Sequence, residues 1–287
     1  MKPIVKYQGG KTRELPLIKT LLPQNYDTVL EPFAGGAAVS FALGHRCILN
    51  DMNDALINMY QQVSHPTTFH EVFSHVNWLK TLEHDDLSVE YYKARDYING
   101  GSRDPYTWAI SYITVRQLCF SGMERYNAKG KFNVPFGHYK KFSCNLDWNH
   151  MKFLHQSGSS IYHGDFAPIF DMATEDDFIF IDPPYLDRLG YAHGNDTLHE
   201  RLVSCMKKSK AKWLFIHSDN DFYRDALSEY HIFYKQFGYA QRFGKNKNHD
   251  AAQVSHMYVT NYEDDMTLHR VNNASLQTLL EPDTIGA

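Results

Sequence analysis

A short acidic and proline-rich motif, Asp182-Pro183-Pro184-Tyr185, directly follows the apolar run Phe178-Ile179-Phe180-Ile181. A run of aromatic and β-branched residues that ends in two prolines predicts a buried strand that stops abruptly. Because proline fixes φ and has no N–H, the loop is stiff and its carbonyls remain acceptors. The Asp182 carboxylate and the Pro183 carbonyl could each accept one N–H of a nucleobase amine, which would aim the nitrogen lone pair at an electrophile. Tyr185 could stack on the base. The alternative is a proline-rich turn with an incidental acid.

A glycine-rich turn forms a second candidate site. It comprises Glu31-Pro-Phe-Ala-Gly-Gly36, between a predicted strand at Thr28–Leu30 and a predicted helix at Ala37–Leu43. This order is the first unit of a dinucleotide-type fold, where glycines allow close packing against an adenosine-bearing ligand. Asp51 follows the next predicted strand, Cys47–Leu49, about 15 residues beyond the glycines, where an acid meets ribose hydroxyls. Alternatively, Asp51 only caps the helix predicted over Ala55–Val63.

Two further segments could contact such a ligand. Lys11 follows paired glycines and precedes a helix predicted over Leu15–Leu22, so it could lie at an anion or carboxylate site. The alternative is a flexible turn with a solvated lysine. Asp165 and Phe166 follow a strand predicted from Ser160. There, Asp165 could accept from an adenine amine and Phe166 could stack on the ring.

Residues 64–157 interrupt the alternation of strands and helices. Helices are predicted over His70–Leu82, Val89–Asn99 and Trp108–Leu118, followed by an irregular stretch with a hairpin turn at Asn127–Gly130 and an incoming strand at Phe132–Val134. Aromatic residues alternate there with Lys and Arg, which suits contact with phosphates and bases. The alternative is a solvated basic loop over an aromatic minicore.

The strand and helix alternation then resumes. After the strands at residues 160 and 178–181, a helix is predicted over Leu198–Met206 and a strand over Trp213–His217. A helix at Tyr223–Tyr230 and strands near Ile232–Phe237 and His256–Thr260 complete the pattern. The order is βαβα, an insertion, βαβα and a closing strand pair, which predicts an α/β protein.

Composition and charge narrow the classes of protein. The 287 residues are 43% apolar and 22% charged, and no segment is long and apolar enough for a membrane span. Four cysteines without a Cys-x-x-Cys pair, and sixteen histidines without a His-Glu-x-x-His pattern, predict neither disulfides nor a metal site. We therefore expect an intracellular, cytoplasmic protein without a metal. The net charge is −4, but residues 116–141 form a basic stretch. This stretch contains six Lys or Arg residues and one acid, Glu124, so its local charge is +5.

With these motifs placed, the chain closely resembles the Dam family (class alpha, D12) of DNA adenine-N6 methyltransferases. The resemblance covers nearly all of residues 4–262. It is carried by Lys6-Tyr-x-Gly-Gly-Lys11, Glu31–Gly36, Asn50-Asp51, Arg125-Tyr-Asn, Phe132–Gly137 with Tyr139-Lys140, Gly164-Asp-Phe166, Asp182–Tyr185, His199-Glu-Arg-Leu202 and Thr260-Asn-Tyr262. Their common order matters more than any single motif.

The resemblance implies a Rossmann-like methyltransferase sheet, in residues 1–63 and 158–287, that binds S-adenosylmethionine. A mostly helical target-recognition domain with a β-hairpin would be inserted at residues 64–157. It also implies three sets of site residues. The cofactor set is Tyr7, Lys11, Phe33, Gly35, Gly36, Asp51, Asp165, Phe166 and Asp182. The catalytic set is Asp182, Pro183, Pro184 and Tyr185. The DNA-binding set is Lys6, Arg116, Phe120, Ser121, Met123, Arg125, Asn133, Pro135, His138, Tyr139 and Lys140.

The implied activity is methylation of adenine N6 in double-stranded DNA by base flipping, with S-adenosylhomocysteine as product and GATC as the leading site. Ser121 and Glu124 stand where the best-known members carry Asn and Cys, and His138 replaces an Arg. We expect a monomer or weak dimer of bacterial, phage or viral origin that makes no membrane contact. The alternatives are an RNA adenine or protein glutamine methyltransferase, and a non-catalytic DNA-binding protein of the same fold.

Overall fold

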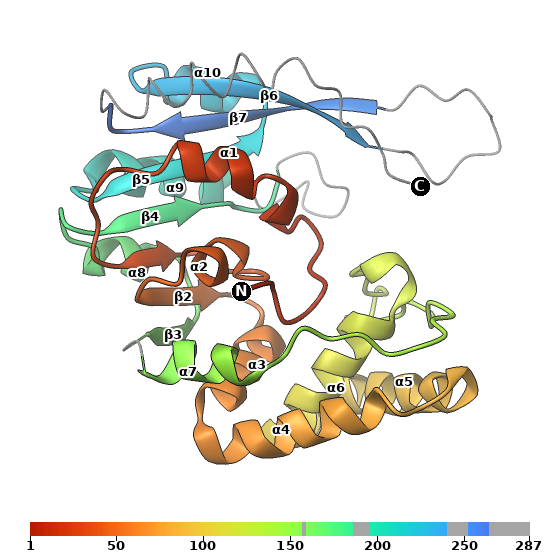
Figure 1. Cartoon of the computed structure of the whole chain (residues 1–287). Helices are drawn as coiled ribbons and strands as arrows, with labels where there is room; N and C mark the ends of the chain where they lie inside the picture. The colour runs from red at the N-terminus through yellow and green to blue at the C-terminus, as the bar shows by residue number, and fades with distance from the viewer. Residues whose placement is uncertain (157–158, 186–195, 240–251, 264–287) are drawn as a thin grey trace. The chain divides into compact units, whose positions relative to one another are not determined.

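The computed structural model describes residues 1–156, 159–185, 196–239 and 252–263 (Figure 1). Its helices are η1 (Lys11–Arg13), α1 (Leu15–Thr20), α2 (Ala38–Leu43), α3 (Asp54–Ser64), α4 (Pro66–Leu79), α5 (His84–Asn99), α6 (Pro105–Leu118), η2 (Phe120–Gly122), α7 (Trp148–Gln156), α8 (Ala167–Met172), α9 (Asp196–Lys208) and α10 (Asp221–Ala226). Its strands are β1 (Val29–Glu31), β2 (Cys47–Asp51), β3 (Ser160–His163), β4 (Phe178–Ile181), β5 (Lys212–Ser218), β6 (His231–Tyr239) and β7 (Ala252–Thr260).

These strands form one seven-stranded sheet with the order β3-β2-β1-β4-β5-β7-β6. The pairings β2–β3, β1–β4 and β4–β5 are parallel, whereas β7 pairs antiparallel with both β5 and β6. Such a mixed, mostly parallel sheet with helices is consistent with a Rossmann-like methyltransferase fold, so the predicted α/β class is confirmed. All seven strands were predicted to within a few residues.

The helices were predicted less accurately than the strands. Helix α10 ends at Ala226, so the predicted extension to Tyr230 is wrong. Helices α7 and α8 were not predicted. Helices α4, α5 and α6 begin three to five residues earlier than predicted. In α6 the cap sets the start, because Asp104 accepts the Thr107 N–H at 2.9 Å and Pro105 occupies the first turn.

The chain divides into two compact units, each with many contacts within itself. The first contains residues 1–15 and 31–166, and the second contains residues 16–30 and 167–287. The predicted functional division, with a target-recognition domain at residues 64–157, stays a prediction.

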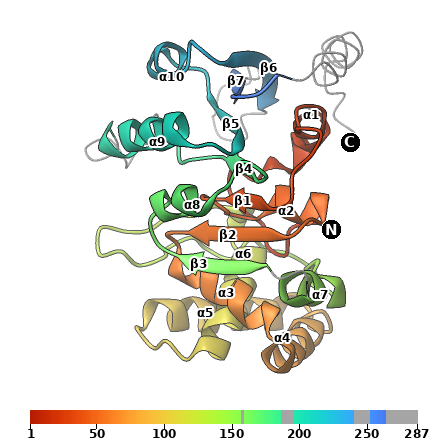
Figure 2. The ribbon, with the colours of Figure 1, turned by 90° about the vertical axis from the view of Figure 1, so that its left-hand side faces the viewer.

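The second unit is layered. Figure 2 shows α8, α9 and α10 on one face of its strands and α1 on the other. All four residues of β4 are buried, as are residues 213–218 of β5, because helices cover both faces of these parallel strands.

In the first unit, α6 packs against both α3 and α5 (Figure 1). Helix α6 is buried over ten of its fourteen residues. It therefore forms the centre of this helical layer, and the segment that follows it, from Cys119, starts from a rigid support.

Candidate active site and nucleic-acid interface

The acidic proline-rich loop begins where β4 ends. Asp182 is half-buried, Pro183 is buried and Pro184 is exposed. Because β4 is fully buried and pairs on both sides, with Val29↔Phe178 and Ile181↔Phe215 among its partners, the position of the loop is set by the sheet. Asp182 thus follows a fixed strand end, as predicted.

The Tyr185 ring packs against two histidines of the same unit. Its centroid lies 4.8 Å from that of His217, at the end of β5, and 5.7 Å from that of His256, on β7. The Tyr185 hydroxyl lies 3.5 Å from His256 Nε2. Both histidines are buried, and His217 Nδ1 contacts the Ser218 carbonyl at 2.8 Å. These contacts hold an aromatic ring beside the loop. The sequence motif had not predicted the role of these histidines.

The glycine turn after β1 requires glycine at Gly35. Its φ is +47°, and a Cβ there would lie 2.9 Å from Cε1 of Tyr7. The Gly35 N–H donates to Asp51 Oδ2 at 2.9 Å, and the Tyr60 hydroxyl donates to the Gly35 carbonyl at 2.8 Å. The turn therefore brings Tyr7, Gly35 and Asp51 of the predicted cofactor set together. A Cβ on Gly36 would also approach Tyr7, at 3.2 Å from its Cβ.

Asp51 does not cap helix α3, so that alternative is wrong. The N-cap is Asn53, whose Oδ1 accepts the Leu56 N–H at 3.0 Å. Asp51 Oδ1 instead accepts the Asn53 N–H at 2.9 Å. Burial raises the pKa of Asp51, while the N–H groups of Asn53 and Gly35 lower it, and the net direction is upward. Each carboxylate oxygen has a second lone pair, so the group can still accept hydrogen bonds from a ligand.

An amide at the end of β2 joins two of the predicted ligand-binding loops. Asn50 Nδ2 donates to the carbonyls of Pro32, at 2.9 Å, and Gly164, at 3.0 Å. This brings Phe33 and Phe166 together, with ring centroids 5.2 Å apart. Asp165, between Gly164 and Phe166, is exposed.

The predicted cofactor-binding residue Lys11 lies inside the protein. Its side chain is buried and its Nζ donates to the Gly9 carbonyl at 3.0 Å. The alternative of a solvated lysine is therefore wrong. A role for Lys11 in holding a carboxylate stays a prediction.

Predicted DNA-binding residues alternate with core residues after the hairpin turn. Phe132, Val134 and Phe136 are buried, whereas Asn133 and Pro135 are not. This is the period of an extended chain, which turns successive side chains to opposite faces. The turn is present. The Asn127 N–H donates to the Lys131 carbonyl at 2.9 Å, and Tyr126 and Phe132 form an isolated antiparallel β-bridge. The predicted turn at Asn127–Gly130 is confirmed. The predicted strand at Phe132–Val134 is wrong, because in this segment Phe132 forms only an isolated bridge with Tyr126.

Arg125 is held by its neighbour across this hairpin. Its Nε donates to Asn133 Oδ1 at 2.8 Å, and its Nη2 donates to the Asn133 carbonyl at 3.3 Å. Within the described residues, Nη1 of Arg125 makes no hydrogen bond, and the side chain is exposed. Asn133 therefore orients a guanidinium that retains donors for a ligand.

The remaining predicted DNA contacts lie around η2. Lys6 Nζ lies 3.9 Å from the centroid of the Tyr139 ring and donates to the Gln117 carbonyl at 2.9 Å. The Phe120 N–H donates to the Pro135 carbonyl at 2.9 Å. Ser121 and His138 both have left-handed φ, +53° and +55°. Such conformations of non-glycine residues cluster at ligand-binding sites. Met123 is half-buried, and Lys140 is exposed.

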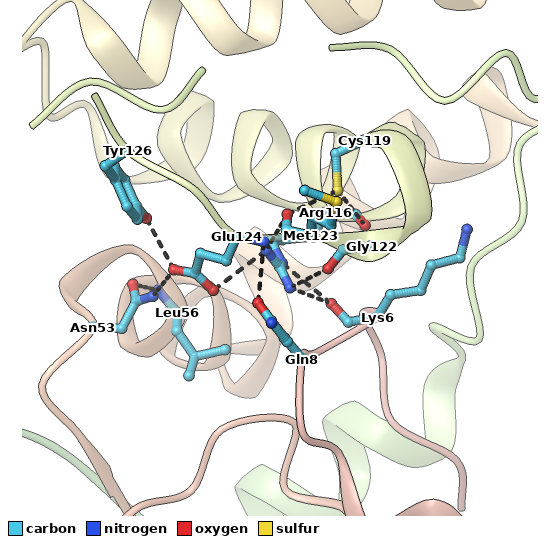
Figure 3. Close-up of polar contacts among 10 residues, drawn as sticks. All are labelled: Lys6, Gln8, Asn53, Leu56, Arg116, Cys119, Gly122, Met123, Glu124 and Tyr126. Carbon is cyan, nitrogen blue, oxygen red and sulfur yellow. Dashed lines mark hydrogen bonds and ion pairs between the residues drawn. The ribbon is translucent and has the colours of Figure 1, made fainter. Parts of the chain in front are cut away.

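Arg116 differs from the rest of the DNA-binding set. Its side chain is only 1% exposed, and its guanidinium bonds to the Lys6, Gly122 and Met123 carbonyls and to Glu124 (Figure 3). A direct phosphate contact, as predicted, would require at least one of these bonds to break. Among the described residues, no group of three or more His, Cys, Asp or Glu side chains is arranged to hold a metal ion.

A comparison with protein families decides what the chain is related to. The sequence profile of the D12 class N6 adenine-specific DNA methyltransferases matches residues 7–241. The chain belongs to this class. It is therefore an adenine-specific DNA methyltransferase, and the family suggested by the motifs is confirmed.

Individual relatives agree. The chain is 32% identical to the type II methyltransferase M.CviBI of Paramecium bursaria Chlorella virus NC1A, over 91% of this chain and 100% of the relative. It is 30% identical to the type II methyltransferase M1.LlaDCHI of Lactococcus lactis, over 91% and 96%. It is also 30% identical to a DNA adenine methylase of Haemophilus influenzae, over 78% and 82%. No helix in the described part of the chain could span a membrane.

Proposed function

We propose that the protein transfers a methyl group from S-adenosylmethionine to adenine N6 at a specific site in duplex DNA, with GATC as the leading site. Membership of the D12 class favours a DNA adenine over an RNA adenine or a protein glutamine. The main support for the proposal is the loop at Asp182-Pro183, which places two hydrogen-bond acceptors at the end of a buried strand. The Tyr185 ring follows in the same loop and packs against two histidines.

The residues around the glycine turn fit the proposed cofactor. The turn combines a backbone without a Cβ at Gly35, a half-buried Asp51 carboxylate and the paired rings of Phe33 and Phe166. The missing Cβ allows close approach by a ligand, the carboxylate can accept hydrogen bonds from ribose hydroxyls, and the two rings can stack on an adenine. When bound, the cofactor would supply an electrophilic methyl group on a sulfonium.

The catalytic residues act on the other reactant. The Asp182 carboxylate and the Pro183 carbonyl would accept the two N–H groups of N6, which localises the nitrogen lone pair for attack. Tyr185 would stack on the base. The target adenine must leave the duplex to reach these groups, at a cost of a few kcal/mol in stacking and pairing. Positioning and electrostatics would supply most of the catalysis, and no covalent enzyme intermediate is needed.

A defined genome methylated in vitro with the purified protein tests the proposal. Sequencing that detects N6-methyladenine should show modification at one short motif, and only when S-adenosylmethionine is added. Modification confined to GATC supports the leading site, whereas a different motif would assign the change to Ser121, Glu124 or His138. No methylated adenine in duplex DNA, with methylation of RNA or protein instead, would contradict the proposal.

A further inference from the structure

Arg116 uses every donor of its guanidinium inside the first unit. Its Nε donates to the Lys6 carbonyl at 3.1 Å, and its Nη2 donates to the carbonyls of Lys6 and Gly122 at 3.0 and 3.2 Å. Its Nη1 donates to the Met123 carbonyl at 3.3 Å and lies 3.3 Å from Glu124 Oε2. A guanidinium has five N–H donors, and each has an acceptor here. Arg116 therefore ties the N-terminal segment to the loop after α6.

Glu124 gathers bonds from three directions (Figure 3). Besides Arg116, its carboxylate accepts from the Tyr126 hydroxyl at 2.9 Å and from Asn53 Nδ2 at 3.4 Å, both at Oε1. Its own N–H donates to Gln8 Oε1 at 3.3 Å. The side chain is only 20% exposed. An acid at this position would repel phosphates, but pairing with Arg116 neutralises it.

The contact with Asn53 extends this network to the cofactor side. Asn53 is fixed at both ends of its amide, since Oδ1 caps α3 while Nδ2 contacts Glu124. Its N–H donates to Asp51, whose other carboxylate oxygen accepts from Gly35. A continuous series of hydrogen bonds thus runs from the glycine turn through Asp51, Asn53 and Glu124 to Arg116.

We propose that Glu124 and Arg116 are positioning residues that hold the Met123–Arg125 segment against the Lys6 backbone and, through Asn53, against the strand end that bears Asp51. This inference rests on the proposed function, because it assigns DNA reading to Met123–Arg125 and cofactor binding to Asp51. Its consequence is that cofactor binding orders the DNA-reading segment through Glu124, by way of its contacts with Asn53, Tyr126 and Arg116.

Hydrogen–deuterium exchange with S-adenosylhomocysteine as the probe tests the coupling directly. In the unaltered protein, the ligand should slow exchange both in residues 33–53 and in residues 120–126. In Glu124→Ala, protection of residues 33–53 should persist while protection of residues 120–126 disappears. Glu124→Gln should restore it in part, because its Oε1 still accepts from Tyr126 and Asn53. If Glu124→Ala does not fold, Asn53→Ser, which keeps an N-cap oxygen but removes the donor to Glu124, carries the same comparison.

Methylation kinetics provide the second measurement. Glu124→Ala should raise KM for a duplex carrying the mapped site by at least about tenfold, with little change in kcat, and should increase methylation of sites that differ by one base pair. Asn53→Ser keeps an N-cap oxygen but removes the donor to Glu124, so it should shift the same quantities in the same direction. Glu71→Gln removes one exposed acid of the same unit, on α4, and serves as the control.

The outcomes distinguish the positioning role from the proposed function. If S-adenosylhomocysteine does not bind the unaltered protein, the proposed function fails and this inference fails with it. If it binds but protects only residues 33–53, or if Glu124→Ala behaves like Glu71→Gln, the proposed function stands and the positioning role is overturned.

Discussion

The side chain of Asn99, at the end of α5, pairs with the backbone of Phe132 through two hydrogen bonds. Asn99 Oδ1 accepts the Phe132 N–H at 2.8 Å, and its Nδ2 donates to the Phe132 carbonyl at 2.9 Å. The Tyr91 hydroxyl adds a third bond from α5, to the Val134 carbonyl at 2.6 Å. Helix α5 therefore holds the segment whose opposite face carries Asn133 and Pro135.

Asn99→Ala should lower the free energy of unfolding by about 1–3 kcal/mol, because two groups of a part-buried backbone lose their partner. Urea denaturation measures the change. The substitution Asn149→Ala, at an exposed position on α7, should stay within about 0.5 kcal/mol. An equal effect of the two substitutions would show that Asn99 does not stabilise the segment.

Asp182→Ala tests the acceptor role of the carboxylate. The rate of methyl transfer should fall by at least about 10²-fold, because the N6 amine loses one positioned acceptor. Binding of S-adenosylhomocysteine, measured by calorimetry, should be nearly unchanged. Asp171→Ala, at an exposed acid on α8, is the matched control and should keep full turnover. Substantial turnover by Asp182→Ala would remove the acceptor role.

Arg125→Ala should weaken binding to the preferred DNA site by about 1–3 kcal/mol and relax the choice at one base pair. The reason is that a guanidinium with donors left over can form a two-pronged contact with guanine. Asn133→Ala should act in the same direction, since Asn133 orients Arg125. Binding to a panel of single-base variants measures both. Uniform weakening on every sequence would identify Arg125 as a phosphate contact.

Lys140 and Lys141 are exposed cations of the basic stretch. Replacing both with glutamine should reduce the slope of log affinity against log salt by roughly 1.8, about 0.9 for each phosphate that is no longer neutralised. Fluorescence anisotropy of a labelled duplex at several salt concentrations measures the slope. Replacing Lys208 and Lys210 removes the same charge outside this stretch. That control should leave the slope unchanged. An unchanged slope after replacement of Lys140 and Lys141 would place the phosphate contacts elsewhere.

Burial raises the pKa of the Cys47 thiol to about 12, so almost none of it is thiolate at pH 8. Cys119 is also buried and its pKa is raised by burial. Both should resist iodoacetamide in the folded protein and react once guanidinium unfolds it, with modification mapped by mass spectrometry. Rapid alkylation of Cys47 in the folded state at pH 8 would show that this part of the chain opens readily.

Much of the fold could be predicted because its determinants are local. The apolar run Phe178–Ile181 before two prolines, and the glycine turn after Thr28–Leu30, specify strand ends through short-range patterns. The residues near those ends could be named for the same reason, as with Asp51 and Asp182. Helix starts were less predictable because several neighbouring polar residues can act as the N-cap. Only the folded backbone shows which of them accepts the hydrogen bond. Asn53, not Asp51, caps α3.

Local sequence patterns were sufficient to predict the seven strands along the chain, the class of the protein and the motifs that carry its chemistry. The contacts of several of those residues depend on the tertiary structure. Arg116 counts as one cation of a basic stretch in the sequence, yet it is buried and bonded to Lys6, 110 residues away. Asn99 carries no motif, yet it supports Phe132, 33 residues later. Composition and periodicity report the type and spacing of side chains, whereas burial and hydrogen-bond partners depend on which distant segments the core brings into contact.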